Sequence, residues 1–271
     1  MEKAASYNHA LFETIKCSKI FKEHTTDINS IDFSNDGQTL ISASDDGMVN
    51  CYDILEGKKT NTYFNKKYDG ISNITFTHSK KCVICSSNSD CDNRIMYWSL
   101  YDNTILLSFL GHTDQITGLE MNNNDDTFLS SSKDGSIRIW NLSTKKLLQH
   151  FSKAKFGCFD PHGKNIAILS TAESQSKNNR INIYPTMNSN AIATFNVDGT
   201  EIKTIKYSPN GKHMVCASDN SLLILETLNG KIVQKMEAIP NESGNTLDPS
   251  FTPVENTLHA EVTLVKSLYG R

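Results

Sequence analysis

Four side chains in one short segment have the residue types of a hydrolytic site. They are His112, a serine at position 130 or 132, Asp134 and Trp140. A serine, a histidine and an acid are the members of a catalytic triad, in which the histidine activates the serine hydroxyl. However, the chain contains no G-x-S-x-G elbow and no glycine-rich phosphate loop. We therefore expect no catalytic residue among them.

A second group has the spacing of a metal or redox site. Cys82 and Cys85 are three positions apart, with His78 and Cys91 close by. On a strand, side chains three positions apart point to opposite faces of the sheet. No second cysteine pair completes four ligands. We interpret these residues as thiols packed within a strand, and we expect neither a metal nor a cofactor.

Four lysine pairs are the remaining charged motifs. Paired lysines in loops are usually only solvated, although a fold that gathered them on one rim would make a surface for phosphate groups. Aromatic residues lie beside one pair, so Lys66, Lys67 and Tyr68 form the candidate partner-binding cluster. The pairs are Lys58-Lys59, Lys66-Lys67, Lys80-Lys81 and Lys145-Lys146.

The elements that would position these side chains are clearest between residues 111 and 141. Alternating apolar residues predict strands over 116–121, 128–132 and 136–140. Polar residues 122–126 predict one turn, and Lys133-Asp134-Gly135 predicts a tight one. Together with a further strand, these segments form a four-stranded unit that cannot bury its own faces.

The same pattern recurs along the chain. An aromatic residue follows the turn residue by six positions in the pairs Asp46 and Tyr52, Asp92 and Trp98, Asp134 and Trp140, and Asn178 and Tyr184; Asp219 and Leu225 repeat the offset without the aromatic. A second register marks the apolar end of each first strand, at Phe33, Phe76, Met121, Phe159, Tyr207 and Phe251. Five complete units and part of a sixth are therefore predicted.

This repeat resembles the WD40 type. The resemblance implies an all-β WD40 β-propeller with five recognisable blades and a fragment of a sixth. We expect a tail over residues 1–14 and a single domain over 15–271, with blades near 22–60, 61–108, 109–149, 150–194 and 195–236 and a partial blade at 237–271. It also implies that His112, Ser132, Asp134 and Trp140 form a buried structural tetrad.

Composition limits the classes of function. The 271 residues carry 27 basic and 30 acidic side chains, for a net charge of −3, which gives no general attraction to nucleic acid or an anionic membrane. No stretch has the length and hydrophobicity of a membrane span, and residues 1–12 lack the apolar core of a secretory signal. Seven cysteines, an odd number, suit reduced thiols. We expect a soluble intracellular protein.

A closer resemblance covers roughly residues 15–253 and is strongest over residues 66–142. Motifs such as Phe109-Leu110-Gly111-His112 and Ser136-Ile137-Arg138-Ile139-Trp140 follow one another at matching spacing. This resembles the WD-repeat subunit shared by the COMPASS-type histone lysine methyltransferase and by the cleavage, polyadenylation and termination machinery. The resemblance implies a nuclear, non-catalytic adaptor. Its implied partners are a SET-domain methyltransferase, the phosphorylated C-terminal domain of RNA polymerase II, and cleavage/polyadenylation and phosphatase-targeting subunits.

The sequence departs from that family at its C-terminal end. The family closes roughly seven blades of about 40 to 45 residues each, and the residues after Val254 show no Asp-Gly turn. A truncated isoform or gene model, a smaller closed propeller and an open arc completed by a partner are the alternatives, of which we favour the first. A strand near residues 15–21 would, in the family, complete the last blade. A WD40 adaptor of another assembly, such as a ubiquitin ligase or a ribosome-assembly complex, and a propeller hydrolase are the functional alternatives.

Overall fold

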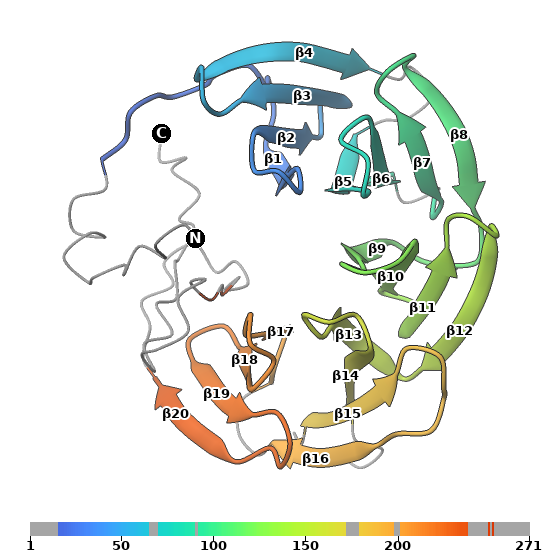
Figure 1. Ribbon diagram of the computed structural model, residues 1–271, viewed down its shortest axis with the longest axis vertical. Coiled ribbons are helices and arrows are strands. Elements are labelled where there is room, and N and C mark those ends of the chain that lie inside the picture. Colours follow the sequence, from blue (N-terminus) through green and yellow to red (C-terminus); the bar gives the residue numbers. More distant parts are fainter. Residues whose placement is uncertain are drawn as a thin grey trace, which may run out of the picture.

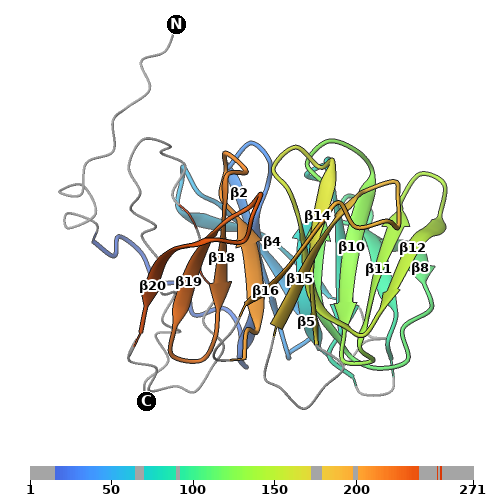
Figure 2. The same cartoon turned by 90° about the horizontal axis from the view of Figure 1, so that it is seen from below.

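The computed structural model describes residues 16–64, 70–89, 92–171, 179–197, 201–237, 249 and 251. Over these ranges, twenty strands form five antiparallel four-stranded sheets, and each sheet takes its strands consecutively from the chain. Figure 1 shows the sheets as blades around a central axis, with the sheet of the first four strands and that of the last four at the two ends of an arc. Seen from the side, the strands run between the two faces of the disc (Figure 2). The predicted all-β propeller with five blades is confirmed.

The strands are numbered along the chain, four to a blade. Blade 1 consists of β1 (Ile28–Phe33), β2 (Thr39–Ser44), β3 (Met48–Asp53) and β4 (Lys58–Phe64). Blade 2 consists of β5 (Ile71–Phe76), β6 (Cys82–Ser87), β7 (Ile95–Ser99) and β8 (Thr104–Phe109). Blade 3 consists of β9 (Ile116–Met121), β10 (Thr127–Ser132), β11 (Ser136–Asn141) and β12 (Lys146–Ser152). Blade 4 consists of β13 (Ala154–Phe159), β14 (Asn165–Thr171), β15 (Asn179–Pro185) and β16 (Ala193–Val197). Blade 5 consists of β17 (Thr204–Tyr207), β18 (His213–Ala217), β19 (Leu222–Glu226) and β20 (Ile232–Met236).

Blade 3 forms from the pattern that predicted it. The three strands expected there match β9, β10 and β11 to within one residue. At the tight turn between β10 and β11, the backbone N–H of Ser136 donates to Asp134 Oδ1 at 2.8 Å. Gly135 has a φ of 74°, a left-handed conformation that glycine adopts without strain. The local sequence therefore specifies both the strands and the turn that joins them.

The second register is also confirmed for the five complete blades. The expected apolar positions are the last residues of β1, β5, β9, β13 and β17, the strands nearest the axis in Figure 1. The sixth position, Phe251, belongs to no described strand and packs against the buried residues Val215, Ala217 and Leu222 of blade 5. The rest of the partial blade expected at 237–271 lies outside the described residues, apart from residues 237 and 249.

The approximate blade boundaries predicted from the sequence lie within one to four residues of the ends of the outer strands. The expected boundaries at 60, 108, 149 and 194 fall inside β4, β8, β12 and β16, the outer strand of each of the first four blades. Outer strands are largely exposed, as the pattern of β4 shows, and lack a strong apolar alternation. Their ends therefore carry little signal in the sequence.

The core lies between neighbouring blades. One buried cluster joins Ile41 and Val49 of blade 1 to Phe76 and Trp98 of blade 2. Blades 2 and 3 meet where the ring of Phe109 lies 5.1 Å from that of Phe128 and 5.5 Å from that of Trp140, measured between centroids. Each sheet thus buries its faces against the next one, which is how repeats with no core of their own become stable.

The N-terminal segment does not form the expected strand. Residues 16–21 are described and take no part in a sheet. The Phe21 ring instead packs on Tyr52 of β3, with 4.6 Å between centroids, and Glu23 pairs with Lys59 of β4 at 2.7 Å. An aromatic contact and an ion pair therefore hold this segment against blade 1.

Candidate functional site

The predicted polar residues of blade 3 converge in a buried hydrogen-bond network. His112 lies before β9, Asp134 in the β10–β11 turn and Trp140 in β11. His112 Nδ1 lies 2.8 Å from Asp134 Oδ2, and His112 Nε2 lies 2.8 Å from Ser130 Oγ. The indole N–H of Trp140 donates to the same Ser130 Oγ at 2.9 Å. The network therefore ties the start of the blade to its second and third strands.

The serine of this network is Ser130, and the prediction of Ser132 is wrong. Ser132 Oγ donates to the backbone carbonyl of Asp114 at 2.9 Å and accepts the backbone N–H of Asp134 at 3.1 Å. Both serines lie on β10, two positions apart, and strand alternation gives them the same face. The positions of the imidazole and the indole, which both contact Ser130 Oγ, distinguish them.

The burial and the electrostatics of this network favour a role in holding the strands together. Burial lowers the pKa of His112, against the opposing effect of Asp134. Burial alone would raise the pKa of Asp134, but hydrogen bonds from Ser136, His112 and the Thr113 backbone hold it down to about 2. Ser130 has no solvent exposure, so its hydroxyl cannot reach an external substrate. A satisfied buried network of this kind fixes one arrangement of the strands.

Blade 1 contains a second network that the sequence reasoning missed. His24 Nδ1 lies 2.9 Å from Asp46 Oδ2, and His24 Nε2 lies 2.7 Å from Ser42 Oγ. Asn50 Nδ2 adds a contact of 3.1 Å to the same His24 Nε2. The ring of Tyr52, predicted as the closing aromatic, packs against Phe21. The signal was present, because His24 precedes Asp46 by 22 residues, as His112 precedes Asp134.

The other predicted turn and closing residues do not form such a network among the described residues. The carboxylate of Asp92 accepts from Arg94 Nε at 2.6 Å, and Trp98 Nε1 donates to Asn103 at 3.2 Å. Tyr184 packs on Phe151, with 4.7 Å between ring centroids, and Asp219 pairs with Lys203 at 2.6 Å. Asn178 lies outside the described residues, as do Lys66, Lys67 and Tyr68.

The cysteine pair lies on β6 with its members in different surroundings. Cys85 is fully buried in the cluster between blades 1 and 2, and burial raises the pKa of its thiol to about 12. Cys82 is only partly buried. The two thiols therefore have the opposite-face geometry expected for a strand.

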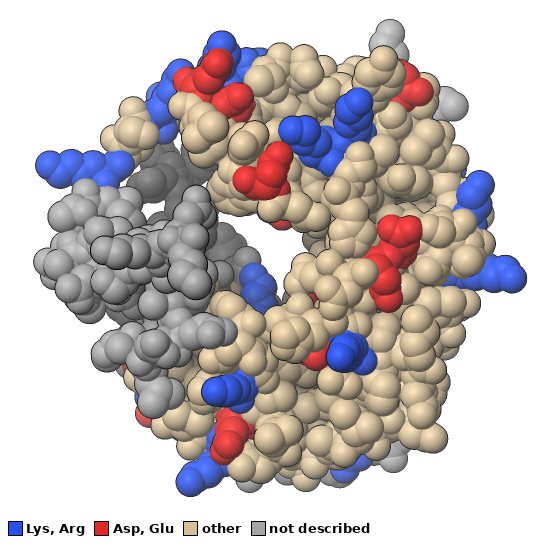
Figure 3. All heavy atoms as spheres, viewed as in Figure 1, with Lys and Arg blue, Asp and Glu red and all other residues tan. Residues whose placement is uncertain are grey.

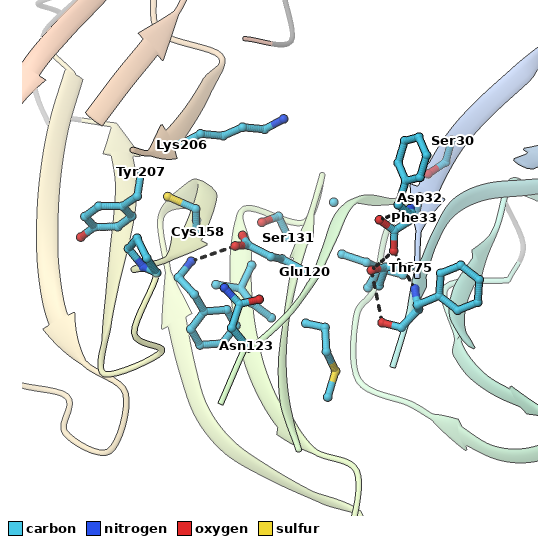
Figure 4. Close-up of a pocket in the computed structure, with 18 of the residues that line it drawn as sticks. Ser30, Asp32, Phe33, Thr75, Glu120, Asn123, Ser131, Cys158, Lys206 and Tyr207 are labelled. Carbon is cyan, nitrogen blue, oxygen red and sulfur yellow. Dashed lines mark hydrogen bonds between the residues drawn. The ribbon is translucent and has the colours of Figure 1, made fainter. Parts of the chain in front are cut away.

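The first strands of the blades line a cavity of about 810 Å³ at the centre of the fold (Figure 4). The residue before each apolar strand end contributes to its wall; these residues are Asp32, Thr75, Glu120, Cys158 and Lys206. Two of them connect neighbouring blades through a carboxylate.

Asp32 Oδ2 accepts the backbone N–H of Phe76 and the hydroxyl of Thr75, both at 2.7 Å, which joins blade 1 to blade 2. Glu120 Oε1 accepts the backbone N–H of Phe159 at 3.3 Å, joining blade 3 to blade 4. Burial raises the pKa of both carboxyls, that of Glu120 to about 7. Asp32 and Glu120, which line the cavity, therefore each hydrogen-bond a neighbouring blade.

The molecular surface around the opening of the central cavity carries both basic and acidic side chains. On the face seen in Figure 3, lysine and arginine side chains are interspersed with acidic ones and do not gather into one basic patch. Within the described residues, no helix has the length and apolar character needed to cross a bilayer. This face therefore carries charges of both signs.

Comparison with known proteins agrees with this architecture. The profile of the family "WD domain, G-beta repeat" matches residues 15–53, 103–141 and 189–225. With five four-stranded blades and the His-Ser-Asp-Trp network of blade 3, the chain is a WD40-repeat β-propeller protein.

Individual relatives define the family more closely. The chain is 32% identical over 252 residues to WD repeat-containing protein 82 of Drosophila melanogaster, a match that covers 90% of this chain and 77% of that protein. It is 28% identical over 229 residues to COMPASS component SWD2 of Saccharomyces cerevisiae, with 81% and 67% covered. It is 27% identical over 231 residues to Set1 complex component swd2 of Schizosaccharomyces pombe, with 83% and 63% covered. The chain belongs to the family of WD repeat-containing protein 82, and the predicted resemblance is confirmed.

Proposed function

We propose that this protein is a non-catalytic WD40 adaptor of a COMPASS-type histone lysine methyltransferase complex in the nucleus. The observation that carries the proposal is the similarity to a COMPASS component and a Set1 complex component over more than four fifths of this chain. The fold supports it, because a propeller offers a rigid surface on which several partners assemble. The partner we expect to hold it in the complex is a SET-domain methyltransferase subunit.

The proposal extends to transcription and transcript 3′-end processing. We propose further contacts with the phosphorylated C-terminal domain of RNA polymerase II and with cleavage/polyadenylation and phosphatase-targeting subunits. Lys66, Lys67 and Tyr68 stay the sequence-based candidates for a phosphorylated ligand, since ammonium groups pair with phosphate and the ring adds contact area. They lie between β4 of blade 1 and β5 of blade 2 in the chain.

Affinity capture from nuclear extract tests the adaptor role. The tagged full chain should recover a SET-domain methyltransferase, and the captured material should methylate histones. Recovery of neither a SET-domain methyltransferase nor polyadenylation factors would place the protein in another assembly. Recovery of polyadenylation factors without histone methylation activity would refute the COMPASS assignment but would leave a scaffold role in 3′-end processing.

The lysine cluster has its own test with a matched control. The variant K66A/K67A/Y68A should lose binding to a phosphorylated polymerase C-terminal repeat peptide, measured by fluorescence anisotropy. The variant K145A/K146A removes a second lysine pair, at the β11–β12 turn, and should bind as the natural protein does. Equal losses in the two variants would show that the effect is general charge and not a site.

A further inference from the structure

One position of the repeat differs in blade 3 from all other blades. The third strand of each blade carries a residue two positions before its closing residue: Asn50, Met96, Arg138, Asn182 and Leu223 in blades 1 to 5. Only in blade 3 is this residue charged. A residue of the outer strand lies opposite it in the antiparallel register, and these two facing residues can be compared between blades.

In blades 1 and 4 the side chains at this position of the third strand and opposite it on the outer strand hydrogen-bond each other. Thr62 of β4 lies opposite Asn50 and donates to its Oδ1 at 2.7 Å. Thr194 of β16 lies opposite Asn182 and donates to its Oδ1 at 2.9 Å. A hydroxyl donor and an amide acceptor thus close the outer part of each of these blades.

In blade 3 the corresponding pair consists of two basic side chains. Arg138 of β11 lies opposite His150 of β12. Within the described part of the chain, neither has a hydrogen-bond or ion-pair partner for its side chain, and Arg138 Nε is buried without an acceptor. A guanidinium has no acceptor of its own, and a partly desolvated one without a counter-charge is unfavourable. This pair therefore presents donors that nothing in the chain accepts.

The surroundings hold the guanidinium in place. It lies over the Trp140 ring, 6.0 Å from the centroid. A Cβ at Gly111 would collide with Arg138 Nη1, so glycine at that position makes room for it. Two large apolar side chains close by in the chain are open to solvent: Leu110 is 68% exposed and Leu148 is 39% exposed. The site is thus a guanidinium over an indole ring, with two exposed leucines near it in the sequence.

The electrostatics of the neighbouring histidine agree with an unneutralised positive charge. After burial, the effects that lower the pKa of His112 are the charges of Arg138 and His150. Both basic groups therefore act on His112 from the same region, and no described carboxylate pairs with either. A bound anion there should raise the pKa of His112.

We propose that Arg138 and His150 form a binding site for a carboxylate of an acidic peptide segment in a protein partner, with Leu110 and Leu148 contacting its apolar neighbours. A guanidinium edge accommodates the two oxygens of a carboxylate, and the imidazole adds one donor. Arg138 supplies one permanent positive charge, which matches the single charge of a carboxylate better than the nearly two charges of a phosphate. The site rests on the contacts of blade 3, so it stands separately from the proposed membership of a methyltransferase complex.

The probe for the test is an acetylated, amidated peptide of sequence Leu-Glu-Leu, with matched peptides that carry glutamine or phosphoserine at the centre. Binding to the full chain is followed by the ¹⁵N-¹H resonance of Arg138 Nε and by those of the His112 ring. The glutamate peptide should bind at least about tenfold more tightly than the glutamine peptide. It should also shift the Arg138 Nε resonance and raise the pKa of His112.

The decisive variant copies the other blades. R138N/H150T installs the Asn-Thr pair of blades 1 and 4, so the blade keeps a satisfied pair while the site is lost. This variant should bind the glutamate and glutamine peptides equally weakly. K164Q, which removes an exposed cation from the β13–β14 turn, should bind as the natural protein does.

Three results would overturn the proposal. The first is equal binding of the glutamate and glutamine peptides by the natural protein, a measurement that needs no variant to fold. The second is undiminished glutamate binding by folded R138N/H150T. The third is tight binding of the phosphoserine peptide with none of the glutamate peptide, which would make the site a phosphate site.

Discussion

Removing the hydroxyl of Ser130 tests whether the network of blade 3 stabilises the fold. The hydroxyl has three partners in a fully buried position: His112 Nε2 at 2.8 Å, Trp140 Nε1 at 2.9 Å and the backbone carbonyl of Arg138 at 3.5 Å. S130A leaves the indole N–H and the imidazole nitrogen without partners. Each buried group left unpaired costs about 1–3 kcal/mol. We therefore expect S130A to lower the free energy of unfolding by about 2–4 kcal/mol.

The matched control is S132A, two positions along the same strand. Its hydroxyl bonds the backbone of Asp114 and Asp134 at the end of β10, where Asp114 is exposed and water can replace the lost contact. The expected loss is about 1 kcal/mol. Urea unfolding followed by far-ultraviolet circular dichroism measures both variants.

A double-mutant cycle with W140F isolates the bond between the indole and the hydroxyl. W140F keeps an aromatic ring but removes the donor, so S130A should cost about 1 kcal/mol less in the W140F background. The reasoning fails if the two substitutions are additive to within about 0.3 kcal/mol, or if S132A costs as much as S130A.

Three further predictions concern other positions in the blades. Burial raises the pKa of Glu120 from 4.5 to about 7. Protonated Glu120 therefore stabilises the fold fully below about pH 4.5, and this stabilisation, at most about 3 kcal/mol of the free energy of unfolding, is lost as the pH rises through about 7. E120Q should flatten the dependence of the free energy of unfolding on pH, measured by urea unfolding at a series of pH values. G135A should cost about 1 kcal/mol for its left-handed turn alone, whereas G163A should cost about 2–3 kcal/mol because its Cβ would also collide with the buried Asn122; equal costs would show that crowding is unimportant. D32A should speed hydrogen exchange of the Phe76 amide, which donates to Asp32, by about tenfold or more. Unchanged exchange at Phe76 would show that the carboxylate does not hold blades 1 and 2 together.

The sequence predicted the repeat with little ambiguity, and the reason is local. Alternation within strands and turn residues at fixed offsets depend on neighbours a few positions away, so β9, β10 and β11 could be located to within one residue. The outer strands could not be bounded as well, because an exposed strand such as β4 keeps no apolar alternation. The network of blade 1 could have been found from the spacing of His24 and Asp46, which repeats that of His112 and Asp134.

The amino-acid sequence by itself determined the class of fold, the number of complete blades and the family. The tertiary structure alone decided that Ser130 and not Ser132 joins the network, since both share one face of β10 and the packed imidazole and indole select between them. It also decided that Arg138 meets His150, because antiparallel register sets which side chains of two strands lie opposite each other. A repeat is encoded in short-range periodicity, whereas a site depends on contacts between segments that the chain brings together only when the sheets form.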